Sequence, residues 1–160
     1  MKNSEWIVRS ANENDVEQVL RAICSLLTEL RGDSEAPLPS SAQNVVHHLI
    51  DPTTQGAIFL AETATPERTC IGCITLSVQE AIHLGGRYAL IQELWVHPEF
   101  RSAAIGAALV LAVEEYCREN NLKSLEVCLP KRNFITFEKT IGFYQKVGFN
   151  ELGPRMRKGV

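Results

Sequence analysis

The spacing of apolar residues changes along the chain and predicts helices and strands in mixed order. Apolar positions three and four residues apart predict four amphipathic helices, at 13–30, 41–50, 104–120 and 135–147. Short apolar runs predict strands at 6–9, 57–61, 70–78, 88–96 and 124–129, with two further short candidates at 149–152 and 155–158. We therefore expect an α/β fold in which a mixed, mostly antiparallel sheet of six to seven strands is flanked by about four helices.

Turn and capping residues agree with these boundaries. Asn12 is expected to cap the first helix, the pair Asp51-Pro52 to stop the second, and Gly148 to end the last. The stretch 31–41 is expected to be a loop. A crossover helix should join the strand 88–96 to a parallel strand at 124–129. No repeat or linker is visible, so residues 1–160 are expected to form a single domain.

Composition and charge narrow the class of protein. The net charge is -3, which argues against a nucleic-acid partner because no basic stripe is available to neutralise phosphates. No apolar run is long enough to cross a membrane, and the first ten residues lack the apolar core of a secretory signal. The number of cysteines is odd, at five, and they are scattered. Reduced thiols and a cytoplasmic location are therefore expected.

The stretch 91–113 contains a candidate anion site. An apolar strand ending at Val96 is followed by a short turn, His97 to Arg101, and then by a helix that begins with small residues. Free backbone N–H groups at a helix N-terminus bind phosphate, and Gly106 lets a ligand come close to the main chain. The alternative is that the small residues only allow tight packing of the helix on the sheet. The glycine patterns of a P-loop and of a dinucleotide fingerprint are both missing.

Residues 94–109, LWVHPEFRSAAIGAAL, resemble the acyl-CoA motif of the GNAT superfamily of N-acetyltransferases. In that family an apolar strand and Val-x-Pro are followed by Gln/Arg-x-x-Gly-x-Gly/Ala. Arg101 and Gly106 match this pattern, whereas Ala104 replaces the central glycine. The extra methyl group is expected to crowd the pyrophosphate slightly and to leave the amide free.

A second stretch, 143–149 (FYQKVGF), resembles the C-terminal Leu/Phe-Tyr-x-Lys-x-Gly-Phe element of the same family. The Asn and Ala that usually precede this Tyr are Phe137 and Thr140 here. The resemblance implies that Tyr144 is the general acid that protonates the CoA thiolate as it leaves. The alternative is a core tyrosine, because Phe137, Ile141 and Tyr144 share a helix face.

The resemblance implies a GNAT-like fold and an acetyl-CoA-dependent N-acetyltransferase. The backbone of Leu94, Trp95 and Val96 would bind the pantetheine arm, and the Leu94 and Val96 amides would polarise the thioester carbonyl. The pyrophosphate would lie on the amides of the following turn and helix start, namely Arg101, Ser102, Ala103, Ala104, Ile105, Gly106 and Ala107. The Arg101 side chain would add a charged contact to a phosphate.

Glu93 is the candidate base, acting through water on the acceptor amine. Simple strand alternation puts Glu93 on one face with Ile91 and Trp95, and a bulge would change that phase. The alternative is a paired or edge charge without a catalytic role.

Other chemistry-bearing residues carry weaker signals. Cys70 and Cys73 have CxxC spacing, but alternation in a strand should point their thiols to opposite faces, so no metal site is expected. The histidines lack triad partners in the sequence, and His83 could line the acceptor side. The carboxylates of Asp33, Glu35 and Glu80 could bind a cationic acceptor, although solvated loop charges are the commoner explanation.

The acceptor is expected to be a small-molecule or peptide amine, and the family resemblance also suggests a homodimer paired through the C-terminal strands. Two other functions stay open. One is a non-catalytic acyl-CoA-binding or regulatory module on the same fold, and the other is transfer of an acyl group longer than acetyl.

Overall fold

A single mixed sheet forms the centre of the protein, and the order of its strands in space follows their order in the chain. The computed structural model describes residues 5–32 and 37–159. The sheet order is β1-β2-β3-β4-β5, with strands β1 Trp6–Ser10, β2 Gly56–Thr63, β3 Cys70–Ala81, β4 Gly86–Val96 and β5 Leu125–Val127. The first three pairings are antiparallel, and β5 lies parallel to β4. The predicted crossover to a parallel strand is confirmed.

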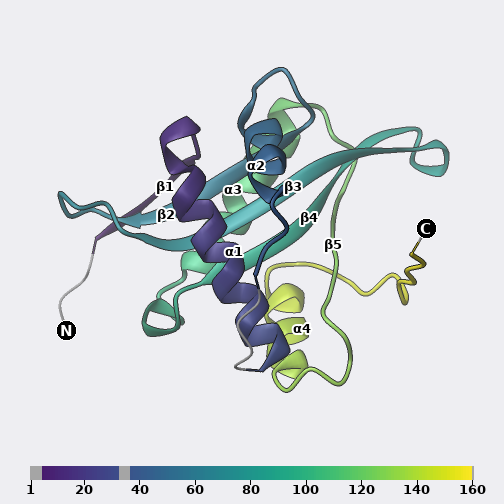
Figure 1. Ribbon diagram of the computed structural model, residues 1–160. Helices are drawn as coiled ribbons and strands as arrows, with labels where there is room; N and C mark the ends of the chain where they lie inside the picture. Colours follow the sequence, from purple (N-terminus) through teal and green to yellow (C-terminus); the bar gives the residue numbers. More distant parts are fainter. Residues whose placement is uncertain (1–4, 33–36, 160) are drawn as a thin grey trace.

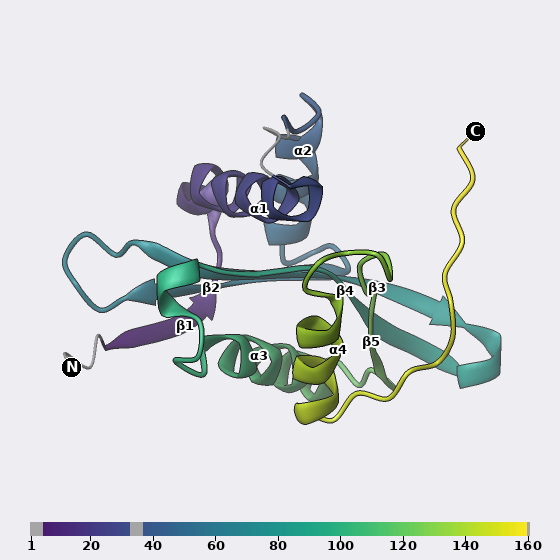
Figure 2. The ribbon, with the colours of Figure 1, turned by 90° about the horizontal axis from the view of Figure 1, so that it is seen from below.

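Four α-helices cover the two faces of this sheet, as predicted. They are α1 Val16–Arg31, α2 Ala42–Ile50, α3 Ile105–Glu119 and α4 Phe137–Lys146, with short 3-10 turns at Glu13–Asp15, Ile82–Leu84 and Pro98–Phe100. Figure 2 shows α1 and α2 on one side of the sheet and α3 and α4 on the other. Figure 1 shows the hairpin of β3 and β4 projecting beyond the other strands.

Each face of the sheet has its own apolar core. On the α3 face, the core contains Ile74, Leu76, Ile91, Leu109 and Val113, all of them fully buried. On the α1 and α2 face, it contains Val19, Leu60, Cys73 and Trp95. Buried apolar area of this kind is the main source of stability for a two-layered α/β domain. The strands that carry the candidate site are therefore buried on both sides.

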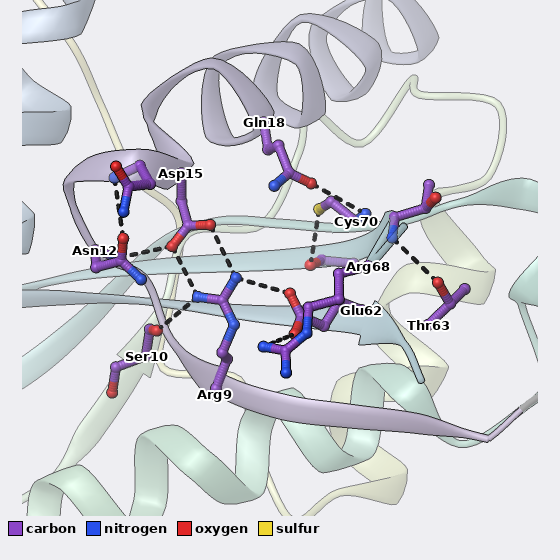
Figure 3. A network of polar contacts seen from close by, with 12 residues as sticks. Arg9, Ser10, Asn12, Asp15, Gln18, Glu62, Thr63, Arg68 and Cys70 are labelled. Atoms are coloured by element: carbon purple, nitrogen blue, oxygen red, sulfur yellow. Dashed lines mark hydrogen bonds and ion pairs between the residues drawn. The ribbon is translucent and has the colours of Figure 1, made fainter. Parts of the chain in front are cut away.

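Polar contacts join the start of α1 to the edge of the sheet (Figure 3). Arg9 on β1 donates to both oxygens of Asp15, at 2.7 and 2.8 Å, and to the buried Glu62 of β2 at 2.7 Å. These contacts with Arg9 lower the pKa of Asp15. Asn12 caps the helix as predicted, because its side chain accepts from the Asn14 amide and its amide donates to Asp15. The network fixes where α1 crosses the sheet.

The sheet has five strands, so the expected six to seven is too many. Residues 149–152 and 155–158 run as extended chain without strand pairing. Leu152 and Met156 are 82 % and 95 % exposed, so the alternation that suggested strands buries neither of them. A strand needs a neighbouring edge for its backbone groups, and β5 offers only three paired residues.

None of the helices in the described part of the chain has the length and hydropathy of a membrane-spanning segment.

Candidate active site

An irregularity in β4 sets the geometry of the candidate site. Leu76 of β3 pairs with Ile91, but the preceding Thr75 pairs with Glu93, so Gln92 is an extra residue in β4. This bulge reverses the side-chain alternation beyond it. Ile91 lies in the α3-side core, whereas Glu93 faces the α1 and α2 side together with Trp95. The expected grouping of Glu93 with Trp95 is therefore confirmed, and its grouping with Ile91 is wrong.

Beyond the bulge, β4 has a free edge. β5 pairs with β4 only along residues 89–91, and the last backbone contact is a 3.5 Å hydrogen bond from the Cys128 amide to the Ile91 carbonyl. On the other edge, the His97 amide donates to Ile71 of β3 at 2.9 Å. Because backbone direction alternates along an antiparallel ladder, the polar groups of Leu94 and Val96 point toward the free edge. The Val96 carbonyl already accepts from Arg101, so an extended ligand could pair with the N–H and C=O of Leu94 and the N–H of Val96.

The turn after β4 leads into the N-terminus of α3, which begins at Ile105. Ser102 and Ala104 have left-handed backbone conformations, with φ of 74° and 62°. The amides of Ile105, Gly106 and Ala107 have no hydrogen-bond acceptor among the described residues, and no acid lies in the first turn. Residues 102–104 are exposed. The helix therefore offers free N–H groups and an uncompensated dipole to an anion.

The backbone conformation of Ala104 is one that favours glycine, the residue of the family pattern at this position. At a φ of 62° a glycine has no steric penalty, whereas the Cβ of an L-residue approaches the following carbonyl. The central glycine of the family pattern is thus accounted for by backbone conformation at this position. Ala104 here adopts the same conformation at a cost in stability.

Gly106 is required for packing between helices. A Cβ on Gly106 would lie 3.2 Å from two ring atoms of Phe143 on α4 and 3.8 Å from Val96. The ring of Phe143 thus occupies the space that a side chain would take. This contact brings α4 against the first turn of α3 and the end of β4, so the two sequence motifs meet in space. The tight contact of Gly106 is therefore with α4 rather than with the sheet, and the amide of this residue has no hydrogen-bond acceptor in the described chain.

Tyr144 lies next to Phe143 and is 7 % exposed. Its ring makes edge contacts with Phe143 and Phe149, with centroids 5.2 and 5.4 Å apart. Burial raises the pKa of the Tyr144 hydroxyl well above its ordinary value, because the charged phenolate would lose its hydration. The hydroxyl has no hydrogen-bond partner in the described part of the chain. Tyr144 is therefore both a core aromatic residue and a protonated phenol.

Arg101 and Trp95 are both held by Glu29 of α1. The guanidinium of Arg101 contacts the two Glu29 oxygens at 2.6 and 2.8 Å, and its Nε donates to the Val96 carbonyl at 3.0 Å. The indole of Trp95 donates to the same carboxylate at 3.1 Å. Sequence analysis did not single out Glu29, because no local pattern links charges 72 residues apart. This cluster fastens the end of α1 to the turn before α3.

The remaining candidates lie apart from this edge. Cys73 and Cys70 both pack against the α1-side core, so the expected opposite orientation is wrong; a second irregularity between Ala61 and Glu62 of β2 changes the phase. No cluster of metal-ligating side chains occurs in residues 5–32 and 37–159. Asp33 and Glu35 lie outside the described residues, and Glu80 and His83 are exposed near the hairpin tip.

The other histidines have structural contacts. His97 accepts from the Glu99 amide and caps the 3-10 turn Pro98–Phe100. His47 contacts Glu13 at 2.6 Å beside a cavity of about 710 Å³ between the start of α1 and α2. Neither motif lines that cavity, whereas a smaller cavity of about 210 Å³ between α1 and β3 is lined in part by Trp95 of the first motif.

Comparison with known proteins agrees with this geometry. The model of the acetyltransferase (GNAT) family matches residues 21–149. A transcriptional regulator from Bacillus halodurans has 18 % identity and a TM-score of 0.78, with 98 % of this chain and 100 % of that chain covered. Among curated proteins, no sequence matches this chain.

Two aminoglycoside acetyltransferases have the same fold. One comes from an uncultured soil metagenomic sample, with 18 % identity, a TM-score of 0.77, and 100 % and 99 % of the two chains covered. The other, from Acinetobacter baumannii, is a 6'-N-acetyltransferase with 17 % identity, a TM-score of 0.71, and 98 % and 99 % covered. At these identities the likeness is one of fold.

The conformation of Ala104 predicts that Ala104→Gly stabilises the protein. Relief of the left-handed strain is worth about 1–2 kcal/mol, and the greater freedom of glycine in the unfolded chain offsets about 0.5–1 kcal/mol of it. The net gain in free energy of unfolding should be about 0.5–1 kcal/mol, measured by urea denaturation. Ala103→Gly is the matched control, because Ala103 is not left-handed, and it should destabilise. Equal losses for both variants would contradict the strain argument.

Proposed function

Because the chain belongs to the GNAT family of acetyltransferases, we propose that it transfers an acetyl group from acetyl-CoA to a primary amine. The observation that carries this proposal is the meeting of the two motifs at the end of β4. Val96 and Phe143 both contact the position of Gly106, and Tyr144 follows Phe143 directly. The end of β4, the start of α3 and the helical turn that carries Tyr144 are therefore neighbours, which supports the proposal.

Acetyl-CoA would bind along the free edge of β4. Its pantetheine arm carries amide groups that can pair with the outward-facing backbone of Leu94 and Val96, as an added strand would. Its pyrophosphate suits the free amides of Ile105 to Ala107, because the positive end of the α3 dipole favours an anion. Of the amides expected to contribute from the preceding turn, those of Arg101 and Ala103 already donate to the Pro98 and Phe100 carbonyls at 3.3 Å, so the proposed further contacts are the amides of Ser102 and Ala104. The reaction that we propose uses no metal ion.

The acceptor would approach from the α1 and α2 face, because the bulge turns Glu93 to that side. Glu93, through a water molecule, takes a proton from the ammonium form of the acceptor. The neutral amine then attacks the thioester carbonyl directly, and the outward amides of Leu94 and Val96 stabilise the oxyanion. Collapse of this intermediate breaks the carbon–sulfur bond and releases the CoA thiolate. The nitrogen, which became positively charged on attack, loses a second proton to water to give the neutral amide, and this proton, through solvent, replaces the one that Tyr144 gives to the sulfur. Acceptor and acetyl-CoA are bound together throughout.

Tyr144 supplies the proton to the departing sulfur. Burial raises the pKa of the phenol, so the phenol is protonated at neutral pH but is a weaker acid than an exposed tyrosine, and the proton must move as negative charge builds up on the departing sulfur. The absence of a described partner for its hydroxyl leaves the donor available for the sulfur. We infer a small cationic amine as the acceptor, supported by the fold likeness to the two aminoglycoside acetyltransferases.

The proposal is tested by calorimetry with CoA and by an amine panel supplied with acetyl-CoA. The panel contains aminoglycosides, polyamines, amino acids and short peptides, and mass spectrometry detects acetylated product. Released thiol is followed against a protein blank, because the described chain has five free cysteines. We expect CoA binding and a product from at least one small amine. No binding at millimolar CoA would overturn the proposal, and binding without product would support a non-catalytic module. Butyryl-CoA tests for a longer acyl group.

A negative charge at the start of α3 should weaken CoA binding. Ala107 is exposed and is the third residue of the helix after Ala104, its N-cap. Ala107→Asp should lower CoA affinity about tenfold, which corresponds to ~1–2 kcal/mol of repulsion between a carboxylate and a phosphate in a partly exposed site. The same change should raise helix stability by about 0.3–1 kcal/mol. Ala107→Asn, which is neutral and of equal size, is the control. Equal affinity for the two variants in calorimetry would argue against a phosphate at this helix.

Tyr144→Phe should lower kcat by about 10²–10⁴ while leaving CoA affinity nearly unchanged, because it removes only the hydroxyl. The ring contacts with Phe143 and Phe149 remain, so stability should change little. Tyr116→Phe is the matched control: the Tyr116 hydroxyl donates to the Gly56 carbonyl at 3.2 Å, away from the β4 edge. That variant should keep its kcat. Unchanged turnover of Tyr144→Phe would refute the acid role.

A further inference from the structure

Thr75 is a buried polar residue whose contact points to the candidate base. It lies on β3, is 3 % exposed, and its hydroxyl donates to the Oε2 atom of Glu93. The two other buried polar residues of the described chain, Asp15 and Glu62, are both paired with Arg9. The hydroxyl of Thr75 has Glu93 as its hydrogen-bond partner.

The contact is tied to the bulge in β4. If Gln92 were paired with β3 in a regular ladder, Glu93 would lie on the same face as Ile91 and would point into the α3-side core. Because Gln92 is an extra residue, Glu93 comes directly opposite Thr75 in the ladder. At the bulge itself, the side-chain amide of Gln92 donates to the Ser77 hydroxyl at 3.0 Å. Two hydroxyl groups of β3, two residues apart, thus hold the two side chains at the bulge.

We propose that Thr75 is a positioning residue that fixes the Glu93 carboxylate for proton transfer, an inference that rests on the proposed function. A carboxylate on a flexible side chain must be held in one orientation if it is to act repeatedly through the same water. The hydrogen bond from Thr75 occupies Oε2 and leaves Oε1 without a hydrogen-bond partner in the described part of the chain. No ion pair involves Glu93 in the described residues.

A neutral donor suits this task better than a cation. A lysine or arginine beside Glu93 would also orient it, but would repel the positively charged form of the acceptor amine. A hydroxyl orients the carboxylate without adding charge. Because Thr75 is only 3 % exposed and its hydroxyl is bonded to Glu93 on the neighbouring strand, any effect of Thr75 on the reaction is expected to pass through Glu93.

The experiment compares Thr75→Val, which keeps the side-chain shape and removes the hydroxyl, with Thr75→Ser, which keeps the hydroxyl. Thr75→Val should lower kcat by about 10- to 100-fold through loss of orientation, with the KM for acetyl-CoA unchanged. Thr75→Ser should stay within about threefold of the wild-type kcat. Ser77→Ala is the matched control, because it removes the other hydroxyl at the bulge, and it should also stay within about threefold. If the Thr75→Val variant does not fold, Thr75→Ala is measured in its place and the same loss of kcat is expected.

A double-mutant cycle separates positioning from general support of the fold. Glu93→Ala alone should lower kcat by about 10²–10⁴. In that background Thr75→Val should change kcat by less than about threefold, because there is no carboxylate left to orient. A further loss that multiplies with the first would show a purely structural role and would overturn the inference. The inference would be supported if Thr75→Ser keeps kcat near the wild-type value and if Thr75→Val does not change kcat in the Glu93→Ala background.

The outcomes distinguish the inference from the function on which it rests. Wild-type protein that acetylates no amine overturns the proposed function, and the role of Thr75 falls with it. An active wild type with a normal Glu93→Ala variant overturns both Glu93 as the base and Thr75 as its positioning residue. An active wild type that needs Glu93, but is unaffected by Thr75→Val, overturns the role of Thr75 alone.

Discussion

An antiparallel ladder cannot place two residues of one strand opposite one of its partner without reversing the side-chain alternation beyond that point. This constraint acts at Gln92, midway along the strand that forms the candidate site. Before it, β4 contributes Ile91 to the α3-side core; after it, Glu93 faces the opposite layer. The same stretch marks where β5 stops pairing with β4. The free edge and the orientation of the candidate base are thus found at one local irregularity.

The second half of the site depends on contact between α3 and α4. Gly106 has no side chain, and the ring of Phe143 lies in the space thereby left open. This packing brings Phe143, the residue before Tyr144, against the first turn of α3, although the two motifs are separated by most of α3, β5 and the following loop. Gly106 therefore combines two properties. Its lack of a side chain allows the Phe143 ring to pack against the helix, and its backbone amide remains free for a ligand. Neither property excludes the other.

Periodicity and motif spacing were sufficient to predict the helices, the central strands and the family, because these are encoded locally. The helix over 104–120 and the capping by Asn12 agree with the structure. The two C-terminal strands were wrongly expected, because pairing depends on an available edge and a face to bury rather than on alternation alone. Thr75 and Glu29 could not be found in this way, since their importance comes from partners that are distant in sequence. The two family motifs predicted that the start of α3 and the helix α4 lie close together. The orientation of Glu93 depends on the pairing register of β3 and β4, which the motifs do not encode.

The ion pair between Glu29 and Arg101 has a thermodynamic consequence. It joins α1, which borders the side that Glu93 faces, to the turn that precedes α3. A ligand that engages Glu29 would compete with Arg101 and with the indole of Trp95, and an anion that engages Arg101 would compete with Glu29 for the guanidinium. By linkage, whatever change in affinity the first ligand causes for the second, the second must cause for the first. The two substrates of a bisubstrate reaction would then sense one another through a single shared carboxylate, without movement of the sheet.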